Sequence, residues 1–312
     1  MQAADFTSQT GSGGAHPRTL RNKKIVVRRR LGRVINYAAL VALSMVYFLP
    51  TWWMLITSVK TLKETFSFPP TFFPRTFSFE GYINAWEYMN WPLHFVNTMI
   101  IVVGSLVGII LTSTLCAYAF ARLRFPGRDT VFIIMLASMM LPGQVTIIPA
   151  YIFFAKIGWL DSFKPLIIPA WFGGGAFNIF LIRQFFSSIP QDLVDAARID
   201  GSSRLGIWWR IMLPLSKPAI TAITVFTIQG KWNDFFGPLI YLNSQNKLTL
   251  ALALNTFQTI AGSQAANAAY QDIGLYTALM AAATVVTLPM IILFISAQKY
   301  FVQGIQMSGI KG

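Results

Sequence analysis

Residue types able to carry out chemistry are few in this 312-residue chain. Its two histidines, His16 and His94, lie far apart, and its single cysteine, Cys116, lies in an apolar run. A metal centre needs several such ligands close together, so we expect no metal site. The phosphate-binding pattern Gly-x-x-x-x-Gly-Lys-Ser/Thr does not occur. No nucleophile is paired with a base either, so we expect neither an enzyme nor a bound cofactor.

Two charged residues are unusual because they lie inside an apolar run. Lys231 and Asp234 interrupt the stretch Pro218–Asn246. Three residues apart on a helix, they share a face and are able to pair. Charges deep in a membrane are costly and usually face a cavity. This segment is therefore a candidate lining for the path of a transported molecule.

Polar and aromatic neighbours extend this candidate path. The Pro142-Gly143 break and the run Gly173–Gly175 loosen the backbone inside other apolar runs. The candidate path residues are Gln144, Asn178, Trp232, Asn233, Asp234 and Phe235. Close helix packing, or a position at the membrane interface, explains the same residues equally well.

The composition indicates an all-α integral membrane protein. Hydrophobic residues make up 54% of the chain and charged residues 12%, where a soluble domain has about a quarter charged residues. The formal net charge is +14. Because the basic residues lie between apolar runs and not on one polar surface, we expect membrane lipid, and no nucleic acid, as the partner of these charges.

Six apolar runs are long enough to cross a membrane, which takes about 20 residues. They are Val34–Val59, Phe95–Ala121, Thr130–Ala155, Pro165–Ile182, Pro218–Asn246 and Ile273–Gln298. The first is too long for the core of a signal peptide. Five or seven spans remain possible, depending on the fifth run and on Leu248–Phe257.

The chain divides into three parts. Residues 1–33 form a basic arm that we expect to be disordered; residues 34–302 form the membrane domain; residues 303–312 form a tail. Of the 25 Lys and Arg residues, 18 lie in the arm, in the C-terminal end from Lys299 onward and in the two loops on their side of the membrane. Six lie on the opposite side, and Lys231 lies within a span. This bias places both termini in the cytoplasm.

The most polar interior segment is Ile189–Pro218, on the cytoplasmic side. It predicts a short helix after Pro190, a corner at Gly201 and a second helix closed by prolines. Its apolar residues are not covered by hydrocarbon, so they favour a partner protein. An ordinary helical hairpin between two spans is the plainer interpretation.

This segment resembles the EAA loop of ABC importer permeases. The matching residues are Asp195, Ala196, Ala197, Asp200, Gly201, Leu213 and Pro214. The family has Glu where this chain has Asp195. From Asn36 onward the chain looks like the smaller permease subunit of maltose-type carbohydrate importers, down to Gln298–Gly304 and the final Lys311-Gly312.

The resemblance implies a type I importer permease fold with six transmembrane helices in a bacterial or archaeal cytoplasmic membrane. It implies that loop 189–218 docks on a cytoplasmic ATPase, present in two copies, which binds the ATP. The other implied partners are a second permease subunit, an extracellular or periplasmic solute-binding protein and a sugar. From the residues alone, an ion-coupled secondary transporter remains the alternative, although Lys231 and Asp234 are few groups for a proton or ion relay.

The first external loop, between about Lys60 and His94, is rich in Phe, Pro, Tyr and Trp. Such a loop is typical either of an aromatic belt at the lipid headgroups or of a surface that faces a partner. The sequence does not decide between the two.

Overall fold

The computed structural model describes residues 18–265 and 275–308. The chain divides into two units, Met1–Trp53 and Met54–Gly312. In unit 1 the described residues belong to helix α1 (Arg18–Thr57). Residues 18–33, which we expected to be disordered, are helical. Lys and Arg are good helix formers, so the helix of the apolar run extends back through them.

In the described part of unit 2, all the regular secondary structure is helical and there is no strand. After the end of α1, its helices are α2 (Leu62–Thr65), α3 (Glu80–Tyr88), α4 (Trp91–Arg122), α5 (Arg128–Ala137), η1 (Ser138–Met140), α6 (Gly143–Lys156), α7 (Lys164–Ile167), η2 (Ile168–Trp171), α8 (Ala176–Ser188), α9 (Gln191–Ile199), α10 (Arg204–Ile207), η3 (Trp208–Met212), α11 (Leu213–Leu215), α12 (Lys217–Trp232), α13 (Phe236–Tyr241), η4 (Gln245–Lys247), α14 (Leu250–Ala265) and α15 (Leu275–Ser308).

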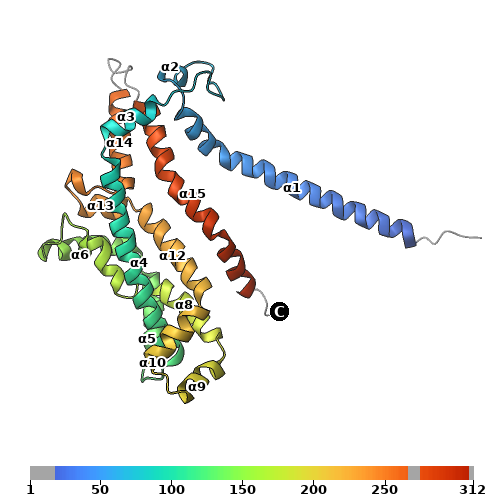
Figure 1. The fold of residues 1–312 in the computed structure, drawn as a ribbon, viewed down its shortest axis with the longest axis vertical. Helices are drawn as coiled ribbons and strands as arrows, with labels where there is room; N and C mark the ends of the chain where they lie inside the picture. The colour runs from blue at the N-terminus through green and yellow to red at the C-terminus, as the bar shows by residue number, and fades with distance from the viewer. Residues whose placement is uncertain (1–17, 266–274, 309–312) are drawn as a thin grey trace, which may run out of the picture. The chain divides into compact units, whose positions relative to one another are not determined.

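Helix α4 is the central element of unit 2 (Figure 1). It packs on α8 and α12, and α12 in turn packs on α15. The buried face of α4 carries small or hydroxyl residues such as Ser105, Gly108, Ser113 and Ala117. Small side chains let helices approach closely inside a membrane. The Ser113 hydroxyl donates to the Ile109 carbonyl of its own helix, at 2.5 Å, so it leaves no unpaired polar group there.

Four helical stretches are long and apolar enough to cross a membrane, or six if each of two bent pairs is one span. The four are Gly32–Thr57, Trp91–Arg122, Lys164–Ser188 and Leu275–Gln298. They correspond to the first, second, fourth and sixth predicted spans. The third predicted span is bent by 97° between Met140 and Gly143, at the expected Pro142-Gly143 break.

The fifth predicted span is not one continuous helix. Helix α12 ends at Trp232, and α13 begins at Phe236. In the break, the carboxylate of Asp234 accepts a hydrogen bond from the Gly237 backbone N–H, at 3.0 Å. An Asp side chain that bonds to a nearby backbone amide favours a turn over a continuous helix.

The fourth span is broken where the sequence has three glycines. All three have positive φ, and that of Gly174 is +63°. A Cβ atom on Gly174 would lie 2.7 Å from Cγ2 of Ile109 on α4. The glycines thus allow both a left-handed backbone and a close approach to α4. Close helix packing was one of the explanations that the sequence left open for them.

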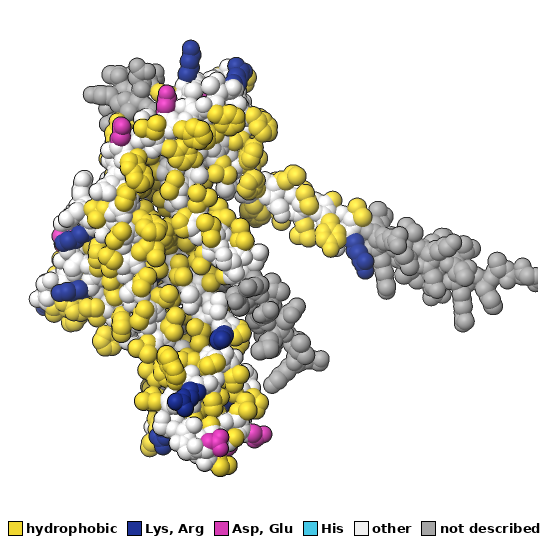
Figure 2. All heavy atoms as spheres, viewed as in Figure 1, with side chains coloured by type: hydrophobic (Ala, Val, Ile, Leu, Met, Phe, Trp, Pro, Cys, Tyr) yellow, Lys and Arg dark blue, Asp and Glu magenta, His cyan; other side chains and the backbone are white. Residues whose placement is uncertain are grey.

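Two large apolar cores lie at opposite ends of α4. One surrounds Tyr118 and Phe186 and includes residues of the 189–218 segment. The other surrounds Trp91, Trp232 and Phe257. On the face shown in Figure 2, hydrophobic side chains cover the body of unit 2, and charged side chains gather at its ends and along one edge. An apolar surface of this kind suits a lipid environment.

Candidate functional site

The predicted helix, glycine corner and second helix are present in segment 189–218, which we call the hairpin. Helix α9 begins after Pro190 and ends at Ile199. Gly201 makes the corner with φ +78°. Ser203 caps the second helix, because its hydroxyl oxygen accepts from the Gly206 N–H at 3.1 Å. A π-helical turn over Trp208–Met212 then leads to α11.

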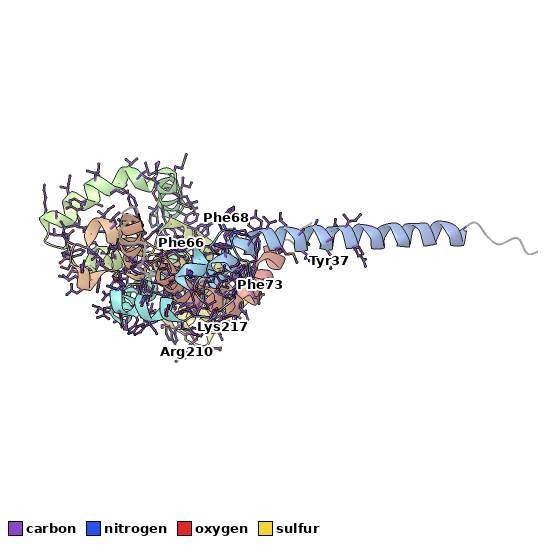
Figure 3. All side chains as sticks on the ribbon, turned by 90° about the horizontal axis from the view of Figure 1, so that it is seen from above. Tyr37, Phe66, Phe68, Phe73, Arg210 and Lys217 are labelled. Carbon is purple, nitrogen blue, oxygen red and sulfur yellow. The ribbon has the colours of Figure 1, made fainter. Side chains whose placement is uncertain are left out.

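The hairpin has one buried face and one exposed face. Val194, Ile207 and Met212 are almost fully buried and belong to the same core as Tyr118 and Phe186 of α4 and α8. The apolar residues Leu193, Ile199, Leu205 and Trp209 are exposed, Ile199 to 87%. Arg210 and Lys217, labelled in Figure 3, are exposed basic residues of the same segment. Part of the hairpin is thus anchored in the membrane domain, and part presents apolar surface.

The residues matched to the EAA loop lie on both faces. Ala197 is buried, Asp195 and Leu213 are half-buried, and Ala196, Asp200, Gly201 and Pro214 are exposed. The Asp195 carboxylate pairs with Arg198 at 3.0 Å and accepts from the Gln191 side-chain amide at 3.1 Å. Its bonds therefore stay within α9.

Arg122, which the sequence did not single out, connects α4 to the hairpin. Its guanidinium donates to the Gln191 side-chain oxygen at 2.6 Å and to the Phe186 carbonyl at 2.5 Å, and it also bonds to the Ile189 carbonyl. One side chain thus joins the end of α4, the end of α8 and the start of α9. These partners lie more than 60 residues away in the sequence, so local pattern gave no signal for them.

The candidate path residues do not gather at one place. Trp232 and Asn233 line a cavity of about 340 Å³ between α12, α14 and α15, together with Gln229 and Thr287. Trp232 is nearly buried, and its indole N–H donates to the Val286 carbonyl at 3.2 Å.

The other candidates lie elsewhere. Gln144 is exposed on α6, and Asn178 on α8 donates to the Gly174 carbonyl at 2.6 Å. Phe235 is half-buried in the break between α12 and α13 and packs against the core around Trp232. None of the three lines the cavity.

Lys231 and Asp234 bond to separate backbone groups, and the ion pair that their spacing permits is not formed. The Lys231 ammonium donates to the Leu166 carbonyl at 3.0 Å, and the Ser105 hydroxyl donates to the same oxygen at 3.2 Å. Leu166 lies where the fourth span changes from α7 to η2. Lys231 therefore connects α12 to the broken span.

A second polar cluster, also missed from the sequence, lies between α6 and α7. The Asp161 carboxylate pairs with Lys247 at 2.9 Å and accepts from the Ser244 hydroxyl at 2.6 Å and from the backbone N–H groups of Asn243 and Ser244. The Ser244 hydroxyl, Lys247 and these amides hold the pKa of Asp161 well below its usual value. The cluster fixes the connection between α13 and α14 against the turn before α7.

Among the described residues, no group of three or more His, Cys, Asp or Glu side chains is placed to hold a metal ion. What the geometry offers is an anchored hairpin with exposed apolar residues at one end of a membrane domain. The fold and this hairpin define the chain as a polytopic, all-helical membrane protein.

Comparison with known proteins specifies the family. The family described as "Binding-protein-dependent transport system inner membrane component" matches residues 104–307. The chain belongs to this family of inner-membrane transport components, and its several long apolar helices fit a multi-pass membrane protein. The expected resemblance to importer permeases is confirmed.

Several curated proteins are similar over most of their length. The chain is 31% identical over 265 residues to the diacetylchitobiose uptake system permease protein NgcG of Streptomyces coelicolor, covering 85% of this chain and 84% of that protein. It is 30% identical over 276 residues to the arabinooligosaccharides transport system permease protein AraQ of Bacillus subtilis, covering 86% and 92%.

Solved structures share the fold. A chain of a bacterial ABC transporter involved in the import of the acidic polysaccharide alginate superposes with a TM-score of 0.77 at 25% identity, covering 87% of this chain and 97% of that one. A second solved chain gives a TM-score of 0.58 at 17% identity, which supports a shared fold and nothing more. It comes from a bacterial alginate ABC transporter in complex with an alginate pentasaccharide-bound periplasmic protein.

Proposed function

We propose that this chain is one permease subunit of an ATP-driven ABC importer that carries a sugar or oligosaccharide across the cytoplasmic membrane. The relatives' names support the substrate class, since they are uptake proteins for diacetylchitobiose and arabinooligosaccharides. The alginate importer, which shares this fold, imports an acidic polysaccharide. A solute-binding protein outside the membrane delivers the sugar, as the complex of the alginate transporter with its periplasmic protein suggests.

The observation that carries the mechanism is the two-faced hairpin. Its exposed apolar residues Leu193, Ile199, Leu205 and Trp209 form a surface that suits a protein partner. We assign this surface to a cytoplasmic ATPase, present in two copies, which binds the ATP. The bias of Lys and Arg toward this end supports a cytoplasmic location for the hairpin and for both termini, in a protein of six spans.

Transport then follows from the attachment of the hairpin. When ATP closes the two ATPases, the hairpin moves with them. Because Arg122 joins α9 to the ends of α4 and α8, that motion passes directly into two spans. The two permease subunits rock from an inward-facing to an outward-facing state. The cavity beside Trp232 and Asn233 is the part of this chain best suited to line the sugar path, because it offers amide and hydroxyl groups.

An ion-coupled secondary transporter was the other class left open by the sequence. It loses its support, because the chain belongs to a binding-protein-dependent family. Moreover, Lys231 and Asp234, which were already few groups for a relay, are bonded to separate backbone atoms.

The test is retention of the ATPase during purification from the native membrane. Ile199→Asp puts a charge at the most exposed apolar position of the hairpin, and we expect it to release the ATPase and to abolish sugar uptake. Ile199→Val is the matched control and should retain both. Normal ATPase recovery with Ile199→Asp would refute the docking role.

A further inference from the structure

The segment between α1 and α4 displays an unusual amount of apolar surface at the end of unit 2 opposite the hairpin. Eight of its large apolar side chains are exposed to more than half of their full area. We call six of them the aromatic collar: Phe66, Phe68, Phe77, Phe79, Ile83 and Trp86. Figure 3, which views unit 2 from this end, labels Phe66 and Phe68. Phe68 is 96% exposed.

The rings are held outward by an ordered frame. The Glu64 carboxylate accepts from the Thr71 hydroxyl at 2.9 Å and from the Arg75 backbone N–H at 2.8 Å. The Ser78 N–H donates to the Val59 carbonyl at 2.9 Å and closes the loop at its base. The loop therefore has a defined shape in which its polar groups bond inward and its phenylalanines face outward.

Helix α3 continues the collar with a second apolar face. Phe79, Ile83 and Trp86 follow one another at i, i+4 and i+7, which places them on one side of the helix. The other side packs on the start of α15 through Gly81 and Ala85. A Cβ atom on Gly81 would lie 2.9 Å from the Thr277 carbonyl oxygen, so the glycine is what allows α3 to lie this close to α15.

The position of the collar specifies what covers it. The segment starts directly after the end of α1 at Thr57 and runs to the first residue of α4. It also contacts α15, because Phe66 packs on Tyr276 in the first turn of that helix, with ring centroids 5.7 Å apart. Each of these three helices is long and apolar enough to cross a membrane, which puts the residues at Thr57, Trp91 and Leu275 at its surface. Aromatic side chains are enriched at this depth, and an amphipathic helix lies there with its apolar face about 5–10 Å into the headgroup boundary.

We infer that the aromatic collar is a lipid-binding surface that inserts into the membrane leaflet at the end of unit 2 opposite the hairpin. The exposed charges of the same segment, such as Arg75 and Glu87, lie among the headgroups and water. Contact with lipid removes the rings from water, which is favourable because apolar surface is buried. The collar would thus fix the height of three spans relative to the bilayer.

The experiment measures which medium surrounds single collar positions. Cys116 is the only cysteine, so Cys116→Ser gives a background in which Phe68→Cys and Trp86→Cys each carry one nitroxide label. Glu87→Cys is the matched control, because it lies on α3 beside Trp86 but outside the apolar stripe. The chain, with the subunits that purify with it, is placed in nanodiscs of phosphatidylethanolamine and phosphatidylglycerol. Collisions with oxygen, which concentrates in lipid, are compared with collisions with a water-soluble nickel chelate.

We expect the ratio of oxygen to nickel collisions to be several-fold higher at positions 68 and 86 than at position 87. Equal ratios at the three positions, or a high ratio at only one of the first two, would overturn the inference. So would a fall in both collision rates at 68 and 86 on adding solute-binding protein, since the collar would then be a protein-docking surface. These outcomes do not depend on whether the hairpin binds an ATPase.

Discussion

The guanidinium of Arg122 and the side-chain oxygen of Gln191 lie 2.6 Å apart, which ties the last residue of α4 to the first residue of α9. Arg122 is also bonded to the carbonyls that end α8. Its removal therefore frees three acceptors at once at the base of the hairpin. This makes Arg122 the residue whose loss should separate the hairpin from the spans most cleanly.

We expect Arg122→Ala to leave ATPase binding intact but to abolish sugar-stimulated ATP hydrolysis and uptake in reconstituted vesicles. Each hydrogen bond to a charged group contributes about 1.5–3 kcal/mol, so the thermal midpoint of the complex should also fall. Arg124→Ala is the matched control, because Arg124 is exposed in the loop that directly follows α4. Full coupling in Arg122→Ala would show that motion reaches the spans by another route.

The two faces of the hairpin should respond differently to truncation. Met212→Ala removes a fully buried side chain and should destabilise the complex by about 2–5 kcal/mol. Leu205→Ala shortens an exposed side chain and should leave the thermal midpoint unchanged while weakening ATPase retention. Thermal unfolding and co-purification, measured on both variants, distinguish the two effects. The idea of separate faces fails if both variants lose stability equally.

Gly174→Ala tests the break in the fourth span. The left-handed backbone costs a non-glycine residue about 1–2 kcal/mol, and overpacking against Ile109 adds about 1–3 kcal/mol. We expect a lower thermal midpoint and poor uptake. Ile109→Ala destabilises by itself because Ile109 is buried in the core, so the comparison is a double-mutant cycle: Gly174→Ala should lower the midpoint less in the Ile109→Ala background than in the unmodified chain. An equal drop in both backgrounds would mean that the backbone strain dominates.

The Asp161 cluster predicts a defined pH dependence. The folded pKa of Asp161 is depressed below the value of about 3.9 for an unfolded Asp. The stabilisation is therefore fully present above about pH 5 and is lost as the pH falls toward the folded pKa. Asp161→Asn should lower the thermal midpoint at pH 7 and flatten its decline between about pH 5 and pH 3.

Asp129→Asn is the control for Asp161→Asn. Asp129 belongs to the exposed ion pair with Arg128, so its loss should change the midpoint little. If Asp161→Asn and the unmodified chain lose stability in parallel as the pH falls, another carboxylate is responsible for the acid sensitivity.

The sequence predicted those features that depend on local pattern. Apolar runs located most spans, and Pro190 and Gly201 defined the hairpin, because turn chemistry is set by neighbouring residues. Contacts between distant segments could not be predicted in this way. Examples are the hydrogen bond from Arg122 to Phe186 and the ion pair of Asp161 with Lys247, which form only when the spans have packed.

The same limit explains the errors. Lys231 and Asp234 have a spacing that permits an ion pair. Instead, Lys231 is hydrogen-bonded to the Leu166 carbonyl and Asp234 to the Gly237 amide. The helix beyond Trp232 was expected to continue because its residues are apolar. A short polar sequence, Asn233-Asp234, instead supplied its own turn.

The core that the hairpin shares with α4 and α8 limits how its recognition surface can be copied. Val194, Ile207 and Met212 are buried against Tyr118 and Phe186. A synthetic peptide of residues 189–218 lacks those partners, so it should be largely unfolded in water and a poor competitor of the intact subunit. Drugs or reporters aimed at this surface need the membrane-embedded scaffold present.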